Sequence, residues 1–425
     1  MYCDDHKAVS SHRLLSSRLR RMLLSFLLLF INGCVLKSVI NSPSLLAQSI
    51  TTGLQAITAF DVYVDHAKVH LIVAGTAANH PLKAGVYYLQ SADGGLHWTS
   101  PIIISANTSA PIATRGNDIQ LAVAGQKLLA AWQTQGELPN MGPIASVYSL
   151  DGGKTWASGS NPAINNKGDQ SHLDLTADQH GVFHAVWLED PEENGYQSLR
   201  YAQSSHTGLR WDAAMTLDTS TCSCCWNTLL VTPNAELNVL YRDMQPRDMA
   251  LIQSQDQGKS WQPISRVGAF NWTFEGCPHV GGALAFSGND KLALHSLTWT
   301  GAEQYRGLYY LRSDNNGKSW TAPYRLGNKA VHGDIAANAD AQVIAVWDEM
   351  GAEGTGIVSA QSQDNGATWP VAKRLSATNT SATHPRIVVT ASGFLALWTE
   401  KANKNPAELI MAVFNHDGTT PSTLP

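Results

Sequence analysis

The stretch that decides the fold is Ser149-Leu150-Asp151-Gly152-Gly153-Lys154-Thr155-Trp156. It has the form Ser-x-Asp-x-Gly-x-x-Trp, in which the Ser and Asp side chains can hydrogen-bond turn backbone groups and the Gly can adopt a positive φ. The Trp can pack beneath the turn, so the octapeptide predicts a tight hairpin between two strands. Four close copies and one degenerate copy begin at Ser91, Ser254, Ser313, Ser362 and Ser204.

The copies recur at the spacing of propeller blades. Their tryptophans lie 58, 55, 50, 59 and 49 residues apart along the chain. Each copy follows two strand-like runs, and a last unit without a copy ends in Leu409–Phe414. Seven three-strand units against six octapeptides predict an all-β, seven-bladed β-propeller, whose last outer strand comes from about residues 50–55. A six-bladed propeller is the alternative.

The octapeptides resemble Asp boxes (BNR repeats), and the chain from about residue 50 resembles the sialidase superfamily, in particular bacterial sialidase-like lipoproteins. This resemblance implies the propeller fold. It implies sialidase activity only where three arginines, a Tyr–Glu pair and an Asp complete the catalytic set. The Phe/Tyr-Arg-Ile-Pro motif of that family is missing, and Arg115 is a poor substitute for it. The remaining arginines that could reach the same face show no triad spacing: Arg242, Arg247, Arg306 and Arg386.

The N-terminus has the pattern of an export signal. Three arginines at 18, 20 and 21 precede the apolar run Met22–Ile31, which is too short to span a bilayer comfortably. The run leads into Gly33-Cys34, which resembles a bacterial lipobox. We therefore predict a signal peptide over 1–34 with lipid on Cys34, a tether over 35–49 and a single propeller domain over 50–425. A plain signal peptide or a retained membrane anchor is the alternative.

Repeat phase predicts a ring of side chains at one mouth of the central channel, because the first strand of each blade lines that channel. Counting back 14 to 16 positions from the aromatic residue of the second strand leads to Asp118, His172, Cys225, His332 and His384, and the period adds His279. The predicted ligand-binding set combines Asp118 and the four histidines of this ring with two of the arginines named above, and it comprises Arg115, Asp118, His172, Arg242, His279, His332 and His384. A repeated turn preference for His is the alternative.

A second ring of acids is expected two residues after the same aromatic positions. Its members are Glu189, Asp243, Glu349 and Glu400. Acids gathered around the mouth would favour cations. Ordinary solvated loop acids are the alternative.

The cysteines admit two interpretations. Besides Cys3 and Cys34, the chain has Cys222, Cys224, Cys225 and Cys277. Cys225 and Cys277 lie 52 residues apart, about one blade period, so a disulfide between them is expected in an exported protein. Thiolates beside an imidazole would equally suit copper or zinc. The predicted metal set is Cys222, Cys224, Cys225, Cys277 and His279.

Composition argues against a nucleic-acid partner, because charged residues make up 15% of the chain and the net charge is −5. The sequence thus predicts a ligand- or metal-binding propeller, exported to the periplasm or cell surface and anchored to a membrane by N-terminal lipid. A glycan or a metal ion is the expected partner. An exo-α-sialidase, a glycoside hydrolase, is the alternative, and an interaction scaffold is a third interpretation.

Overall fold

The five close copies of the octapeptide, which begin at Ser91, Ser149, Ser254, Ser313 and Ser362, each form the turn between the third and fourth strands of a blade. In the computed structural model, Ser149 Oγ accepts a hydrogen bond from Gly153 N at 2.9 Å and donates one to Asp151 Oδ1 at 2.8 Å. Gly153 has a φ of +88°, a conformation that costs glycine little. Trp156 Nε1 donates to the carbonyl of Gly153 at 3.0 Å, which holds the indole beneath the turn. The same Ser-to-Gly bond recurs at Ser91, Ser254, Ser313 and Ser362.

The structure describes residues 47–416 apart from 78–79, 114–117, 137–141, 165–169, 191–196, 205–209, 275, 277 and 289–291, and it leaves out the side chains of 80–83. The chain divides into Met1–Ser44 and Leu45–Pro425. The export signal, the lipobox and most of the tether lie outside the described residues and stay predictions. Within the described part, no helix is long and apolar enough to cross a membrane.

The strands form seven four-stranded antiparallel sheets, which confirms the predicted seven-bladed propeller. Blades one to three are β2 (Leu54–Asp65), β3 (Lys68–Ala77), β4 (His80–Ser91), β5 (Ile102–Ile103); β6 (Ile119–Ala124), β7 (Lys127–Gln133), β8 (Ile144–Ser149), β9 (Ala157–Ser158); and β10 (Gln170–Ala177), β11 (Phe183–Glu189), β12 (Gln197–Gln203), β13 (Met215–Thr221). Blades four and five are β14 (Thr228–Val231), β15 (Leu237–Arg242), β16 (Met249–Ser254), β17 (Gln262–Val267); and β18 (Gly282–Ser287), β19 (Ala293–Thr300), β20 (Gly307–Ser313), β21 (Tyr324–Gly327). Blades six and seven are β22 (Ala330–Ala337), β23 (Val343–Gly351), β24 (Gly354–Ser362), β25 (Lys373–Arg374); and β26 (Thr380–Thr390), β27 (Gly393–Ala402), β28 (Glu408–Asn415), β1 (Gln48–Ser49).

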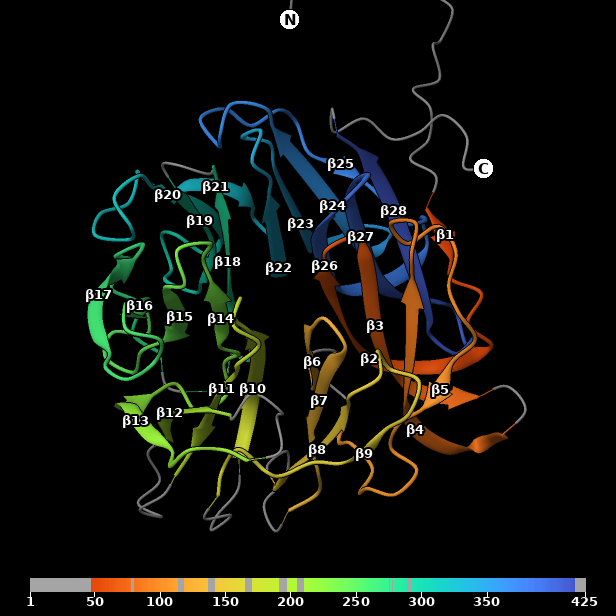
Figure 1. The fold of residues 1–425 in the computed structure, drawn as a ribbon. Coiled ribbons are helices and arrows are strands. Elements are labelled where there is room, and N and C mark those ends of the chain that lie inside the picture. The colour runs from red at the N-terminus through yellow and green to blue at the C-terminus, as the bar shows by residue number, and fades with distance from the viewer. Residues whose placement is uncertain are drawn as a thin grey trace, which may run out of the picture. The chain divides into compact units, whose positions relative to one another are not determined.

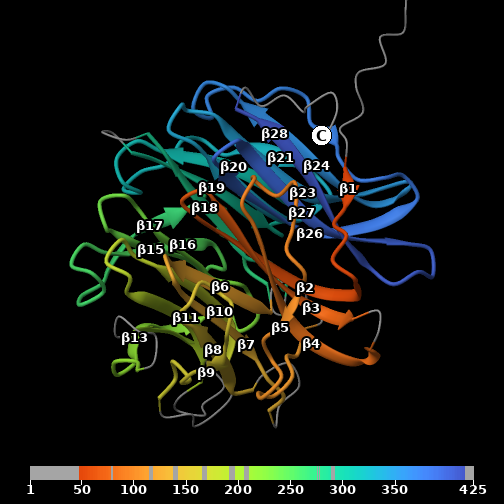
Figure 2. The ribbon, with the colours of Figure 1, turned by 45° about the vertical axis from the view of Figure 1, so that its right-hand side comes forward.

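The N-terminal strand closes the ring. β1 pairs with β28 through Gln48 and Met411 and through Ser49 and Ile410, and Ile50 N donates to Leu409 O at 3.0 Å. The red N-terminal strands therefore meet the blue C-terminal ones (Figures 1 and 2). The closing strand was predicted at about residues 50–55, but residues from Leu54 onward already belong to the inner strand of blade one. The predicted closure of the ring is confirmed, but the closing strand lies several residues closer to the N-terminus than predicted.

Neighbouring blades pack through apolar second strands. Trp132, Trp187, Trp347 and Trp398 are all fully buried there, between the sheets. Inner strands contact one another in ring order, from β2 through β6, β10, β14, β18 and β22 to β26 and back to β2. Second strands can be continuously apolar because both of their faces are covered.

A His–Tyr–Trp contact in blades one, three and five links each of these blades to the next one. In blade five, His295 Nδ1 lies 2.8 Å from Tyr310 Oη, and the Tyr310 ring packs edge-on against Trp369 of the next octapeptide, with centroids 4.6 Å apart. Blades one and three repeat this arrangement with His70, Tyr88 and Trp156 and with His184, Tyr201 and Trp261. These histidines thus serve the interfaces between blades.

Burial makes this contact sensitive to acid. The pKa of His295 is lowered to about 4 because burial disfavours the imidazolium. Between pH 6.5 and 4 this imidazole is protonated in the unfolded chain but stays neutral in the folded chain. The free energy of unfolding therefore falls as the pH falls. We expect His295→Gln to reduce this slope by up to about 1.4 kcal/mol per pH unit, measured by urea unfolding from pH 7 to 4.5.

The control for this slope is His180→Gln, since His180 is exposed. It should leave the pH dependence of unfolding unchanged. An unaltered slope in His295→Gln would contradict the prediction, even if that variant were less stable at every pH.

Candidate ligand site in the central channel

One inner-strand position recurs at the same register in all seven blades. In blades two, three, four, six and seven, the residue at this position pairs with the second-strand residue directly before the aromatic residue. Blades one and five lack the aromatic residue, and there it pairs with the equivalent residue of the second strand. In chain order these are Asp61, Gln120, Asp174, Thr228, Ala283, Asp334 and Arg386. All seven line a cavity of about 580 Å³, to which every inner strand contributes. A cavity of this volume suits a small molecule.

Three aspartates of this ring hold neighbouring inner strands together. Asp61 Oδ2 accepts a hydrogen bond from Leu121 N at 2.8 Å. In the same way, Asp174 accepts one from Leu229 N at 2.6 Å and Asp334 accepts one from Ile387 N at 2.9 Å. The second oxygens of Asp174 and Asp334 accept from Leu175 N at 2.9 Å and from Ile335 N at 3.0 Å, so main-chain N–H groups hold both oxygens of these two carboxylates.

The charges of the ring do not balance. Arg386 Nη2 lies 3.1 Å from Asp61 Oδ1, and its Nε lies 3.6 Å from Asp334 Oδ2. Among the described residues, no cation lies within ion-pair distance of Asp174. Burial raises the pKa of Asp174 to about 7, and it also raises the pKa of Asp61 and of Asp334, although the charge of Arg386 opposes all three shifts. Three carboxylates thus face one guanidinium.

Two predicted histidines meet at this cavity. The rings of His332 and His384 stack with centroids 4.0 Å apart, and both residues line the cavity. Asp348 is buried beside them: its Oδ2 lies 2.7 Å from His332 Nδ1 and accepts a bond from His384 N at 3.3 Å. Burial lowers the pKa of His384 to about 3, so this imidazole is neutral at neutral pH.

The other two histidines lie elsewhere. His172 is buried and packs edge-on against Trp226 with ring centroids 5.0 Å apart, whereas His279 is exposed. Neither belongs to the described lining of the cavity.

Strand register explains this difference from the predicted ring. His172, His332 and His384 do share one repeat position with Asp118, two residues before the charged ring. In blade four that position is Trp226, one residue after Cys225, and in blade five it is Gly281, two after His279. Thr298 replaces the aromatic of blade five, so period spacing alone located His279 wrongly.

The predicted ring of acids has a structural role. The indole N–H groups of Trp187, Trp347 and Trp398 each donate at 2.8 Å to the glutamate two residues later, namely Glu189, Glu349 and Glu400. Asp243 is half-buried and accepts from Met244 N at 2.6 Å. The glutamates are therefore indole acceptors of the blade core.

Among the predicted arginines that the structure describes, Arg242 is not free to hold a carboxylate ligand. Arg242 is buried, and its guanidinium donates to the carbonyls of Val280, Arg247 and Trp299 at 2.7–3.2 Å. Asp118 is buried near the start of β6. Arg115 lies outside the described residues.

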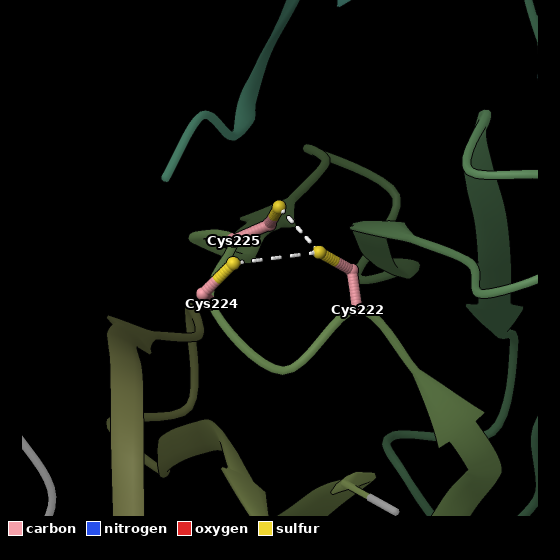
Figure 3. Close-up of side chains that lie close together, drawn as sticks. All are labelled: Cys222, Cys224 and Cys225. Carbon is pink, nitrogen blue, oxygen red and sulfur yellow. Dashed lines mark hydrogen bonds between the residues drawn. The ribbon is translucent and has the colours of Figure 1, made fainter. Parts of the chain in front are cut away.

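The cysteines converge on the connection between β13 and β14. Figure 3 shows the sulfurs of Cys222, Cys224 and Cys225 turned toward one another, with Cys222 Sγ 3.8 Å from Cys224 Sγ and 2.7 Å from Cys225 Sγ. All three are buried free cysteines. Hydrogen bonds with the other two thiols lower the pKa of Cys222. Cys277 lies outside the described residues, and Cys225 is a free cysteine in the structure. The disulfide predicted between Cys225 and Cys277 is therefore not shown.

Several solved structures align with most of this chain. An ulvan lyase of a new polysaccharide lyase family aligns at 10% identity over 88% of this chain and 96% of the lyase, with a TM-score of 0.58. A protein of unknown function from Dyadobacter fermentans aligns at 14% identity over 87% of this chain and 98% of that one, with a TM-score of 0.49. The NanB sialidase of Streptococcus pneumoniae aligns at 12% identity over 89% of this chain and 71% of the sialidase, with a TM-score of 0.48.

No curated protein matches the chain. The family of the BNR repeat-like domain matches residues 58–274, which is 217 of 425 residues and so just over half of the chain. This match agrees with the octapeptides and with the seven blades that they build. The chain belongs to the BNR repeat-like domain family, and the predicted Asp-box propeller is thereby confirmed.

Proposed function

We propose that this protein binds a small, positively charged organic ligand in its central channel. The observation that carries the proposal is the carboxylate of Asp174, which faces a cavity of about 580 Å³ and has no ion-pair partner among the described residues. A buried carboxylate is costly unless a cation pairs with it. An ammonium group of a ligand would supply that missing charge.

The rest of the cavity fits such a ligand. Arg386 already pairs with Asp61 and Asp334, so it offers little to a second anion. Trp226 and the aliphatic residues of the inner strands provide apolar wall, and His332 and His384 lie at the same cavity. An amine with an apolar body would therefore find both a counter-charge and a surface that excludes water.

Acidic sugars fit the cavity less well. The related ulvan lyase is solved with a repeat of glucuronate and sulfated rhamnose. A carboxylate or sulfate in this channel would meet three aspartates and one arginine that is already paired. The alternative, an exo-α-sialidase, would need arginines that are free to hold a carboxylate. The guanidinium of Arg242 instead donates its hydrogen bonds to main-chain carbonyls.

Calorimetry with simple probes tests the proposal. Spermidine and choline are expected to bind at pH 8, whereas glucuronate and N-acetylneuraminate are not. Asp174→Asn should weaken cation binding about thirtyfold, since losing one partner of a buried charge pair costs about 2 kcal/mol or more. With the pKa of Asp174 at about 7, about nine-tenths of it is protonated at pH 6, so affinity for cations should fall roughly tenfold from pH 8 to pH 6.

Asp340→Asn is the matched control, because Asp340 is exposed in a surface turn. It should bind the cations as the unmodified chain does, and the melting temperatures of both variants show whether weaker binding is accompanied by a less stable fold. Binding of the acidic sugars in preference to the cations would overturn the proposal and favour the sialidase alternative. Binding of none of the four probes would also count against it.

A further inference from the structure

The connection between blades three and four buries three thiols in a short loop. Cys222 follows β13 directly, and Cys224 and Cys225 precede β14 by a few residues. Their side chains are 1%, 4% and 1% exposed, whereas Ser223 between them is exposed. A surface connection seldom buries three like side chains, so the loop is folded around its sulfurs.

The sulfurs are close enough to share one ion. All three lie within 4.8 Å of one another. Two thiolates on one ion at about 2.3 Å stand about 3.8–4.0 Å apart. The 3.8 Å between Cys222 and Cys224 already meets that distance, and the 2.7 Å between Cys222 and Cys225 requires those two sulfurs to part by about 1 Å on loading.

Two arginines set the charge of the group. Arg247 Nη1 donates to Cys222 Sγ at 3.4 Å and to Gly276 O at 3.0 Å, which fixes the guanidinium beside the sulfur. The positive charge of Arg242 acts on both Cys222 and Cys225. Three thiolates carry three negative charges and the two guanidinium groups carry two positive charges, so one negative charge is left. A monovalent cation neutralises this charge, whereas a divalent cation leaves an excess positive charge.

We propose that Cys222, Cys224 and Cys225 form a three-thiolate site for Cu(I). Soft thiolate donors suit Cu(I) and also Zn(II) and Fe–S clusters, so the single residual negative charge of the group is what favours the monovalent ion. Arg247 is a positioning residue that stabilises the Cys222 thiolate. The site shares no residue with the cation site in the channel, so either proposal can fail without the other.

Titration of the reduced, anaerobic mature chain with Cu(I), against a Cu(I) chelator of known affinity, tests the site. One Cu(I) should bind per chain, and X-ray absorption should report about three sulfur neighbours. Cys224→Ser should lower the affinity by about a hundredfold or more, and Arg247→Gln should lower it by about ten- to a hundredfold. Ser223→Ala, in the same loop but exposed, should leave the affinity unchanged.

Circular dichroism and melting temperature separate loss of a ligand from loss of the fold, and Cys222→Ser provides a second ligand variant. Three results would each overturn the proposal: equal affinity in Cys224→Ser and Ser223→Ala, tighter binding of Zn(II) than of Cu(I), or a disulfide among these three cysteines in protein isolated anaerobically from its native cell.

Discussion

Arg386→Met is expected to lower the free energy of unfolding by about 3–5 kcal/mol at pH 8, because it leaves buried carboxylates without their cation. Arg386 is the guanidinium that faces both Asp61 and Asp334 in the channel. Burial already raises the pKa of each of these carboxyl groups, and Arg386 is the main influence that lowers it. Methionine keeps the length of the side chain and removes the charge.

The sign of the pH dependence follows from the same shifts. Without Arg386, the folded-state pKa of Asp61 and Asp334 rises further above the unfolded value. The folded state then holds more protons than the unfolded state, so the stability of the variant falls as the pH rises. The deficit relative to the unmodified chain should be greatest at pH 8 and shrink toward pH 5, as urea unfolding at both values would measure.

Two companion variants make this test specific. Arg386→Met combined with Asp334→Asn should regain part of the stability at pH 8, because one of the orphaned charges is gone. Arg306→Met removes an exposed arginine and should change the free energy of unfolding by less than about 0.5 kcal/mol. A deficit that is equal at pH 8 and pH 5 would mean that Arg386 contributes packing and not charge.

Trp398→Ala should cost about 3–5 kcal/mol of stability, as truncation of a fully buried indole does. The side chain lies between blades six and seven, and its Nε1 donates to Glu400 Oε2 at 2.8 Å. The other oxygen of Glu400 accepts from Thr380 Oγ1 at 2.7 Å and from Ala377 N at 3.2 Å. Loss of the indole therefore opens a cavity and also weakens the connection between these blades.

Trp398→Phe separates the two effects. It keeps most of the apolar volume and removes only the donor to Glu400, so its cost should be about 1–3 kcal/mol. Val371→Ala, at a side chain that is 90% exposed, should be within about 0.5 kcal/mol of the unmodified chain. If Trp398→Phe lost as much stability as Trp398→Ala, the indole hydrogen bond and not the buried volume would dominate.

Much of the fold could be predicted from the sequence because the signals are local. The octapeptide turn depends on hydrogen bonds between residues at most four positions apart, such as Ser149 and Gly153. Each copy therefore predicts a hairpin by itself. Counting copies and strand-like runs then predicts the blades. The closing strand was predicted several residues late, because its register depends on β28, which lies more than 350 residues away.

The site could be predicted only in part. Repeat phase correctly placed His332 and His384 at one position, and residue type singled out the Cys222 group. The same phase missed Asp61, Asp174, Asp334 and Arg386, although they recur at one register two residues after the predicted ring. A search for charged residues at one shared register could have found them. Aspartates near turns are common, however, and the sequence does not show that these four residues are buried.

By itself, then, the sequence determined the repeat and the all-β propeller and favoured seven blades over six, since these follow from turns that close within a few residues. Only the tertiary structure decided which charges meet. Arg386 and Asp61 lie 325 positions apart and come within 3.1 Å because the ring closes. Pairing and burial are properties of the closed ring, and they turn an ordinary aspartate such as Asp174 into a buried carboxylate with no cation at ion-pair distance among the described residues.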